Sequence, residues 1–335
     1  MPDFGFPAQP QMSRINDLIN KARRESDAAQ VAVVTGRPAD LAASLKGRVS
    51  EAMLIEKALI DLDQYSQAIA LAEARADVTQ RTLEQTVTLG QDLTASVNQL
   101  LTNGTISNLE IVSAEGRAMV ESTVTALNGR FAGRALFAGD AGDSTALADA
   151  SVISAASVAV LAANTDAAAA YAALEAEFIN PGGQFDTTFY TGGTGSAPLV
   201  EIAQGETVDY DVRADEDALR RVLLNSVIIG AAYDMTNAIP DSMRRDLIST
   251  ATNGLRGAID QTVALQGRLG STEARIATVK ARNIAEDSSL AIRFNDLAAA
   301  DPYTEGLRLS EIENQLETAF LTTARLSRLS LTNYL

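Results

Sequence analysis

The sequence predicts a mainly α-helical protein: a long antiparallel helical bundle or coiled coil, built from both chain ends, with a small α+β inserted domain. Apolar residues recur at three- and four-residue spacing through both ends of the 335-residue chain, the pattern of amphipathic helices. Residues 39–180 and 241–301 contain no proline, which permits long helices, because an interior proline costs about 3 kcal/mol. The middle of the chain breaks this pattern and carries most of the net charge.

The first predicted helix begins at Ser13. The preceding residues 1–12 hold three of the eight prolines, and we expect them to form a disordered extension. Gly36, followed closely by Pro38, is a helix-stop signal. Between these limits one helix face carries Ile15, Leu18, Ala22, Ala29 and Ala32.

A second, very long helix is expected to be capped by Asp40 and to continue to about Leu101, where Asn103-Gly104 breaks it. Its apolar residues keep one 3-4 spaced frame: Leu45, Ala52, Ile55, Leu59, Leu62, Ile69, Ala76, Leu83, Val87 and Val97. A third helix then ends near Asn128-Gly129.

The middle segment from Gly139 to Asp217 holds 14 acidic residues and one basic residue, so it carries −13 of the net charge of −16. Like charges on neighbouring copies repel, so we expect this insertion to face solvent. Its Ala-rich residues 150–178 are predicted to be helical and residues 180–197 to be a loop with a flexible tip at 192–195. Strands at 199–203 and 207–212 are predicted to form a hairpin through Gln204-Gly205.

Helix resumes from Asp215, and a second long frame follows Pro240. Its members are Leu255, Ala258, Leu265, Leu269, Ile276, Val279, Leu290 and Leu297. Glycines at 257, 267 and 270 each weaken an isolated helix by up to about 1 kcal/mol, so we expect them at close helix–helix contacts. Asp301-Pro302 predicts the N-cap and first position of a last helix, whose stripe is Leu309, Ile312, Leu316, Phe320, Leu326 and Leu329.

Antiparallel pairing buries all four stripes: the first helix with the last, and the second with the penultimate. The predicted organisation has four parts. They are a disordered extension, 1–12; a terminal helical, inner polymerising domain, 13–40 and 300–335; a long helical bundle, 41–140 and 218–299; and an acidic inserted outer domain with a β-hairpin, 141–217.

The terminal helices make too small a pair for a stable domain, so their apolar side chains are expected to contact other subunits. The predicted subunit-contact residues are Ile15, Leu18, Ile19, Ala22, Ile312, Leu316, Phe320, Leu326, Leu329, Leu331, Tyr334 and Leu335.

Missing residue types exclude much chemistry. The chain has no Cys, His or Trp, which removes disulfides, thiol nucleophiles, Cys-ligated metal clusters and histidine-based catalysis. We therefore predict no enzyme, no catalytic residue, no cofactor and no metal site. The acidic run 209–217 fails the EF-hand pattern, because Arg213 stands at a ligand position and the loop glycine is missing.

Other partners are also disfavoured. A net charge of −16 argues against nucleic acid as the main partner. No apolar stretch approaches the ~20 residues that span a bilayer, so no membrane span is expected. The first residues show neither the basic region nor the apolar run of a cleaved signal peptide.

Several motifs give the chain a resemblance to the bacterial flagellin superfamily, and within it to the flagellar hook-associated protein 3 family. They are Thr35-Gly-Arg-Pro-Ala-Asp40, Asn103-Gly-Thr-Ile-Ser107, Gly133-Arg-Ala-Leu-Phe-Ala-Gly139, Arg268-Leu-Gly270 and Leu326-Ser-Arg-Leu-Ser-Leu-Thr-Asn-Tyr-Leu335. Each is weak alone, but their order matches the family over roughly residues 1–140 and 205–335.

The resemblance implies a structural subunit without catalytic activity at the hook–filament junction. It implies export of the unfolded chain through the flagellar type III channel and assembly as an extracellular ring. The implied partners are further copies of the chain, the other hook–filament junction protein, flagellin, and a cytoplasmic export chaperone that holds the C-terminal segment. A filament flagellin of the same superfamily is the alternative.

Overall fold

The computed structural model describes residues 8–45, 47–103, 106–164, 166–195, 199–235 and 239–332. Side chains are described for these residues except 8–12, 103, 106–107 and 326–332. The chain folds into two compact units: unit 1 comes from Met1–Asp63 and Ile284–Leu335, and unit 2 from Gln64–Asn283. The predicted fold class, mainly helical with a small β part, is confirmed. The finer division into four parts stays a prediction.

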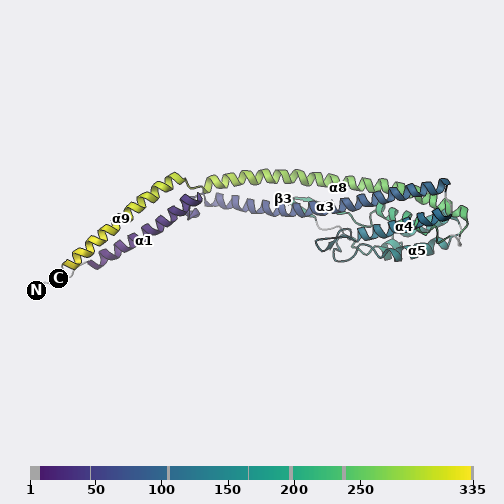
Figure 1. Ribbon diagram of the computed structural model, residues 1–335, viewed down its shortest axis with the longest axis horizontal. Coiled ribbons are helices and arrows are strands. Elements are labelled where there is room, and N and C mark those ends of the chain that lie inside the picture. Colours follow the sequence, from purple (N-terminus) through teal and green to yellow (C-terminus); the bar gives the residue numbers. More distant parts are fainter. Residues whose placement is uncertain are drawn as a thin grey trace. The chain divides into compact units, whose positions relative to one another are not determined.

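Unit 1 pairs the first and last helices, as predicted. α1 (Ala8–Thr35) lies alongside α9 (Pro302–Thr332) (Figure 1). α1 begins at Ala8 instead of Ser13, so residues 8–12 of the expected disordered extension are helical, and residues 1–7 lie outside the described part. α1 ends where predicted, because Gly36 takes the left-handed φ of +66° that glycine favours.

The second long helix begins later than predicted. Asp40 does act as an N-cap, since its Oδ1 accepts from Ala43 N at 3.0 Å, but it caps only the short α2 (Leu41–Ser44). Gly47 then adopts a φ of +98°, and α3 (Val49–Asn103) starts after it. A left-handed residue cannot continue an α-helix, so the chain turns where the apolar frame alone indicated none.

α8 (Asp241–Ala298) runs antiparallel to α3, as predicted. Within unit 2, Lys280 Nζ donates to Glu73 Oε2 at 2.7 Å, and Arg256 Nη2 donates to Asn98 Oδ1 at 2.7 Å. Residue numbers therefore fall along α8 as they rise along α3.

The predicted apolar frames of these helices are largely buried. In the first frame Leu59 and Val87 are partly buried, and the buried members are Leu45, Ala52, Ile55, Leu62, Ile69, Ala76, Leu83 and Val97. In the second frame Leu290 and Leu297 are partly buried, and the buried members are Leu255, Ala258, Leu265, Leu269, Ile276 and Val279.

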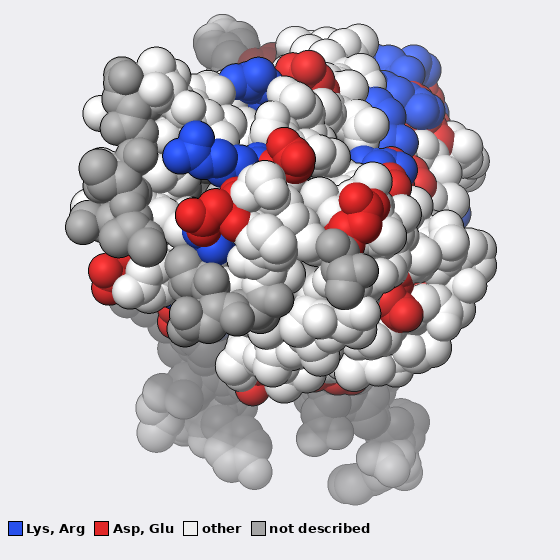
Figure 2. All heavy atoms as spheres, turned by 90° about the vertical axis from the view of Figure 1, so that its right-hand side faces the viewer, with Lys and Arg blue, Asp and Glu red and all other residues white. Residues whose placement is uncertain are grey.

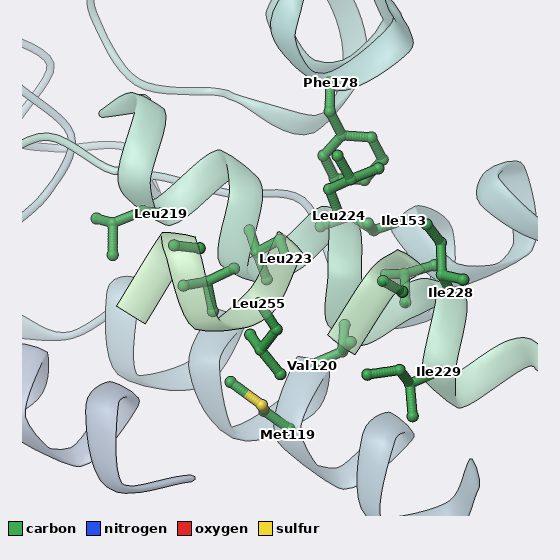
Figure 3. Packing of buried hydrophobic residues seen from close by; sticks show 14 of the residues in the cluster. Met119, Val120, Ile153, Phe178, Leu219, Leu223, Leu224, Ile228, Ile229 and Leu255 are labelled. Atoms are coloured by element: carbon green, nitrogen blue, oxygen red, sulfur yellow. The ribbon is translucent and has the colours of Figure 1, made fainter. Parts of the chain in front are cut away.

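The main core of unit 2 surrounds α7 (Asp217–Ala231), which packs closely on α4 (Ile106–Leu127). Figure 3 shows side chains of several helices meeting there: Met119, Val120, Ile153, Phe178, Leu219, Leu223, Leu224, Ile228, Ile229 and Leu255. The structure places most of this α7 helix out of water, with every residue from Val222 to Ala231 buried.

α4 and α7 approach most closely where two glycines meet. A Cβ atom on Gly116 would lie 2.6 Å from Gly230 N, so no larger residue fits without movement. The expectation that Gly257, Gly267 and Gly270 mark close helix contacts is wrong. A Cβ atom at any of these three positions would meet no atom within 4 Å.

The Ala-rich segment forms α5 (Ala150–Ala162) and α6 (Ala167–Ile179), as predicted. Part of the expected loop is a π-helix instead, η1 (Phe185–Phe189). Its two phenylalanines are buried and pack on Phe178, with ring centroids 5.8 and 5.4 Å from that ring. These aromatic anchors order a segment whose Gly and Thr content indicated a loop.

The glycine-rich residues 192–195 are not a free tip, contrary to prediction. Gly193 N donates to Ala138 O at 2.9 Å, and Gly195 O accepts from Asp140 N at 3.0 Å. Side chains elsewhere in unit 2 also reach this segment, since Tyr190 Oη donates to Gly193 O at 2.8 Å. A Cβ atom at Gly193 would collide with Asp140 Oδ1, so the Asp140 side chain would have to move to admit a larger residue.

The described residues form two short antiparallel hairpins and an isolated antiparallel bridge between Leu147 and Tyr190. The prediction missed β1 (Arg130–Phe131) with β2 (Arg134–Ala135). The second hairpin, β3 (Val200–Ala203) with β4 (Glu206–Val208), is confirmed with a shorter second strand. It packs on α3 and α8 through a small cluster of buried residues: Ile69, Ala72, Ile202, Val208, Ile276 and Val279.

The acidic segment 139–217 keeps most of its charge at the surface, because none of its 14 acidic residues is fully buried, although Asp211 Oδ1 is out of contact with water. Arginines of α7 neutralise some of it: Arg220 Nη1 lies 2.7 Å from Asp186 Oδ1, and Arg221 Nη1 lies 2.8 Å from Glu175 Oε1. On the face drawn in Figure 2, acidic and basic side chains are interspersed among neutral ones.

Candidate assembly surface

The α1–α9 pair of unit 1 buries few of its own side chains. Among the described residues of these two helices, the buried apolar side chains are Ile19, Ala29, Ala32 and Ile312. Both clusters of buried apolar residues, by contrast, lie within unit 2. A few alanines and isoleucines bury little apolar area, so this helix pair holds only a small part of the hydrophobic stabilisation.

Large apolar side chains remain exposed on the same two helices. On α1, Leu18 is 63% exposed and Val34 is 79% exposed. On α9, Tyr303 is 75% exposed and Phe320 is 46% exposed. Exposed apolar side chains that gather on one element are typical of a surface that another molecule covers.

A shallow groove of about 460 Å³ lies between the two helices. Its α1 side is formed by Ile15 and Leu18, and its α9 side by Glu311, Asn314, Gln315, Thr318, Ala319 and Thr322. The polar side chains come from α9 alone. A partner in this groove would therefore meet an apolar wall on one side and hydrogen-bonding groups on the other.

Contacts at two levels join α1 and α9 within unit 1. Arg23 lies over the Phe320 ring, 5.5 Å from its centroid, and such a cation–π contact contributes about 0.5–1 kcal/mol when exposed. At the other end of the pair, Ala300 N donates to Gly36 O at 2.9 Å. Residue numbers fall along α9 as they rise along α1, so the pair is antiparallel, as predicted.

The start of α9 is capped as predicted. Asp301 Oδ1 accepts from Tyr303 N at 3.1 Å, and Thr304 Oγ1 donates to Asp301 Oδ2 at 2.6 Å. The Thr304 hydroxyl and the Tyr303 amide together lower the pKa of Asp301, because both donate to its ionised form. Asp301 therefore stays charged at the positive end of the helix dipole.

The structure places the predicted contact residues in two groups. Ile19 and Ile312 are buried in unit 1, and Ile15, Ala22 and Leu316 are partly buried. Leu18 and Phe320 are exposed and available to a partner. The remaining predicted side chains lie outside the described part: Leu326, Leu329, Leu331, Tyr334 and Leu335. Their role in subunit contact stays a prediction, as does that of the whole set.

The prediction missed exposed apolar residues on the outer sides of both helices. Val31, Tyr303, Leu307 and Leu321 are exposed but lie away from the frame that the sequence analysis followed. A second heptad offset carries the signal, since Leu307 and Leu321 are fourteen residues apart on one helix face. Reading only the most apolar stripe overlooked it.

The described residues show neither a group of acidic side chains suited to a metal ion nor a membrane-spanning helix. Within the described part of the chain, no three acidic side chains are grouped so that they could hold a metal ion. None of the helices described is both long enough and apolar enough to cross a membrane.

Comparisons with known proteins bear on the fold. No family model matches the chain, and no curated protein matches it in sequence. Among solved structures, a protein of Vibrio parahaemolyticus described as a flagellar hook-associated protein matches with a TM-score of 0.53 and 12% identity, over 73% of this chain and 95% of that one. FlgL of Bacillus cereus matches with a TM-score of 0.53 and 14% identity, over 72% and 98%. The resemblance inferred from the motifs is therefore confirmed at the level of the fold.

Proposed function

We propose that this chain is a structural subunit of the bacterial flagellum that joins the hook to the filament and assembles as a ring through its terminal helices. The observation that carries the proposal is the α1–α9 pair, which buries few side chains of its own and leaves Leu18 and Phe320 exposed. The fold shared with hook-associated proteins, together with the ordered sequence motifs, supports the flagellar setting.

Assembly would bury the apolar side chains that the α1–α9 pair leaves exposed. Burial of one exposed Leu or Phe side chain contributes about 1.5–3 kcal/mol, and several such residues lie on α1 and α9. Each copy that joins the ring removes this surface from water on itself and on its neighbour. The terminal helices would thus gain most of their stability from assembly, as in folding coupled to binding.

No catalytic activity or cofactor is part of the proposal. The chain works by occupying a position between two structures, and a sequence without His or Cys suits a part whose chemistry is limited to packing. Its acidic segment, with its carboxylates at the surface, would face outwards in the ring.

The route and partners follow from the same resemblance. We infer export of the unfolded chain through the flagellar type III channel to the hook–filament junction outside the cell. The inferred neighbours are the other junction protein and flagellin, and a cytoplasmic chaperone would hold the C-terminal segment before export. The absence of disulfides fits a chain that must pass a narrow channel unfolded.

Deletion of the gene tests the function directly. We expect cells with hooks but no filaments, and filament protein shed into the medium. Electron microscopy of labelled chain should show a band confined to the hook–filament boundary. Label along the whole filament would instead identify the chain as the filament flagellin.

Complementation with Leu18→Asp tests the surface. A charge at this exposed position should leave the subunit folded but prevent filament attachment, because the buried charge would lack a partner in the ring. Leu199→Asp is the matched control, since Leu199 is 58% exposed in unit 2. Equal motility of both strains would contradict the assigned surface.

A further inference from the structure

α9 carries an outer face that none of the described residues of unit 1 covers. Nine residues, two and a half helical turns, separate the buried Ile312 from both Tyr303 and Leu321, so these two lie on the side opposite the α1 contact. Leu307 belongs to the same side, and the three side chains are 75%, 57% and 58% exposed, in the order Tyr303, Leu307, Leu321. This outer face of α9 is an apolar stripe in water.

Carboxylates border that stripe. Glu313 and Glu317 are exposed between Leu307 and Leu321, and no basic residue occurs from 309 to 324. The outer face of α9 is therefore apolar at both ends and acidic in the middle.

The outer face of α1 carries basic side chains, which the middle of the α9 face lacks. Arg14, Lys21, Arg24 and Val31 follow one another at intervals of seven, three and seven residues, which places them on one side of the helix, and all four are exposed. Three acidic residues share that side, Asp17, Glu25 and Asp27, so basic and acidic side chains alternate on it. Glu25 lies 3.8 Å from Lys21, an exposed pair that contributes little.

We propose that the outer face of α1 in one copy docks on the outer face of α9 in the next copy, so that the subunits join head to tail. This deepens the proposed function and rests on it. Two features select a second copy of the chain as the occupant: the apolar residues of the two faces have matched spacing, and Lys21 and Arg24 complement Glu313 and Glu317. Such an interface uses two different surfaces, and it closes into a ring when the rotation per copy permits.

The proposal specifies a register for copies that stand at the same level. Copies that stand side by side in the same orientation present α1 and α9 antiparallel, with the level set by Gly36 opposite Ala300. At this level Val31 meets Tyr303 and Leu307. About two and three turns further along α1, Arg24 meets Glu313 and Lys21 meets Glu317.

Charge reversal in the full-length chain tests the docking. K21E/R24E makes the α1 face acidic, and E313K/E317K makes the α9 face basic, so each variant repels itself. We expect sedimentation velocity to show self-association weakened by at least about tenfold for each variant alone. An equimolar mixture should regain wild-type association with alternating copies, because every contact then joins opposite charges.

Cysteine cross-linking gives a second readout. The natural chain has no Cys, so V31C and L307C introduce the only thiols. The two positions lie on outer faces of different helices, and a disulfide needs Cα atoms about 4.4–6.8 Å apart. Mixed V31C and L307C chains should form disulfide-linked dimers at least about tenfold faster than either variant alone.

The experiments distinguish a failure of the α1-to-α9 docking from a failure of the proposed ring assembly. R81E/R245E, two exposed arginines of unit 2, is the control and should associate as the wild type does. A wild-type chain that never self-associates would overturn the proposed ring. A wild-type chain that associates, together with variants that also associate alone, would overturn only the α1-to-α9 docking. The docking would also be overturned if the equimolar mixture of K21E/R24E and E313K/E317K chains did not associate although circular dichroism showed both variants folded.

Discussion

Single glycines decide how closely the helices of unit 2 approach. Gly116 and Gly230 let α4 and α7 touch through their backbones, whereas Gly257 of α8 has open space around its Cα atom. Two helical glycines in one chain therefore have opposite roles: one is required by packing, and the other only weakens its helix.

Gly116→Ala should lower the free energy of unfolding by about 1–3 kcal/mol, because the added methyl group would stand 2.6 Å from Gly230 N and force the helices apart. Gly257→Ala is the matched control and should raise stability by up to about 1 kcal/mol, since only helix propensity changes. Urea unfolding followed by circular dichroism measures both. A stabilised Gly116→Ala protein would contradict the close crossing.

Tyr190 holds the glycine-rich segment 192–195 in place through its hydrogen bond to Gly193 O. Burial and the nearby Asp215 raise the pKa of Tyr190 above its ordinary value near 10, although Arg213 acts in the opposite direction. The folded protein therefore binds the phenolic proton more tightly than the unfolded chain does. The resulting stabilisation is complete below about pH 10 and is lost as the pH rises further.

Unfolding free energies measured from about pH 9 to 11 should fall more steeply for the wild type than for Tyr190→Phe, which has no proton to lose. Below about pH 9 the variant should be the less stable of the two, because Gly193 O loses its donor. Parallel pH profiles would show that Tyr190 titrates equally in both states.

The β3–β4 hairpin acts at the scale of elements, because it lies across α3 and α8 of unit 2. Glu206 at the start of β4 binds two arginines of α8: Arg275 Nη2 at 3.2 Å and Arg282 Nη2 at 2.9 Å. Asn283 Nδ2 adds a hydrogen bond to Ile202 O at 2.9 Å. Both arginines, Arg282 foremost, lower the pKa of Glu206, so this link persists until the pH falls well into the acidic range.

Glu206→Gln should loosen the hairpin from α8, since a neutral amide forms weaker bonds to arginine than a carboxylate does. Hydrogen exchange of the β3 and β4 amides should be faster in the variant at neutral pH. The difference should vanish at acidic pH, where the wild-type carboxyl group is also protonated. Glu201→Gln is the control, because Glu201 accepts only from Gly205 N of its own turn among the bonds described.

The elements were predictable where a pattern repeats over many residues. The two long helices and their antiparallel pairing follow from apolar spacing, and the turn at Gln204-Gly205 follows from local chemistry. The break at Gly47 was not predictable from the apolar frame of the second helix. Leu45 belongs to that frame and is buried, so the frame gives no sign that the helix is interrupted two residues later. The π-helix at Phe185–Phe189 depends on Phe178 of another helix, a tertiary contact that no local pattern carries.

At the scale of the whole molecule, stability is divided unequally between the two units. Unit 2 contains both buried apolar clusters, whereas the α1–α9 pair of unit 1 relies on a few small or single apolar residues. Sequence reasoning found this pair and its inner stripe. It missed the outer faces, because mixed charged and apolar positions resemble an ordinary solvated surface.

Limited proteolysis of dilute subunit should cut first within residues 1–40 and 300–335 and leave residues 64–283 intact, because helices without enough buried area open readily. The same sites should be protected in the assembled structure. Mass spectrometry of the early fragments identifies the cleavage sites. Intact ends in dilute monomer, under conditions that cut a denatured control, would contradict the marginal stability of the pair.

The contact between Gly36 and Ala300 also sets a time order for folding. A ribosome adds about 5–20 residues per second. The residues of α1 are therefore synthesised roughly 13–50 s before the first residues of α9. Unit 2 has all of its residues once Asn283 is made, whereas the terminal pair must wait for the last turns of the chain. A truncated or unfinished chain therefore lacks the pair altogether. Completion of synthesis becomes a condition that every copy must meet before it can join others.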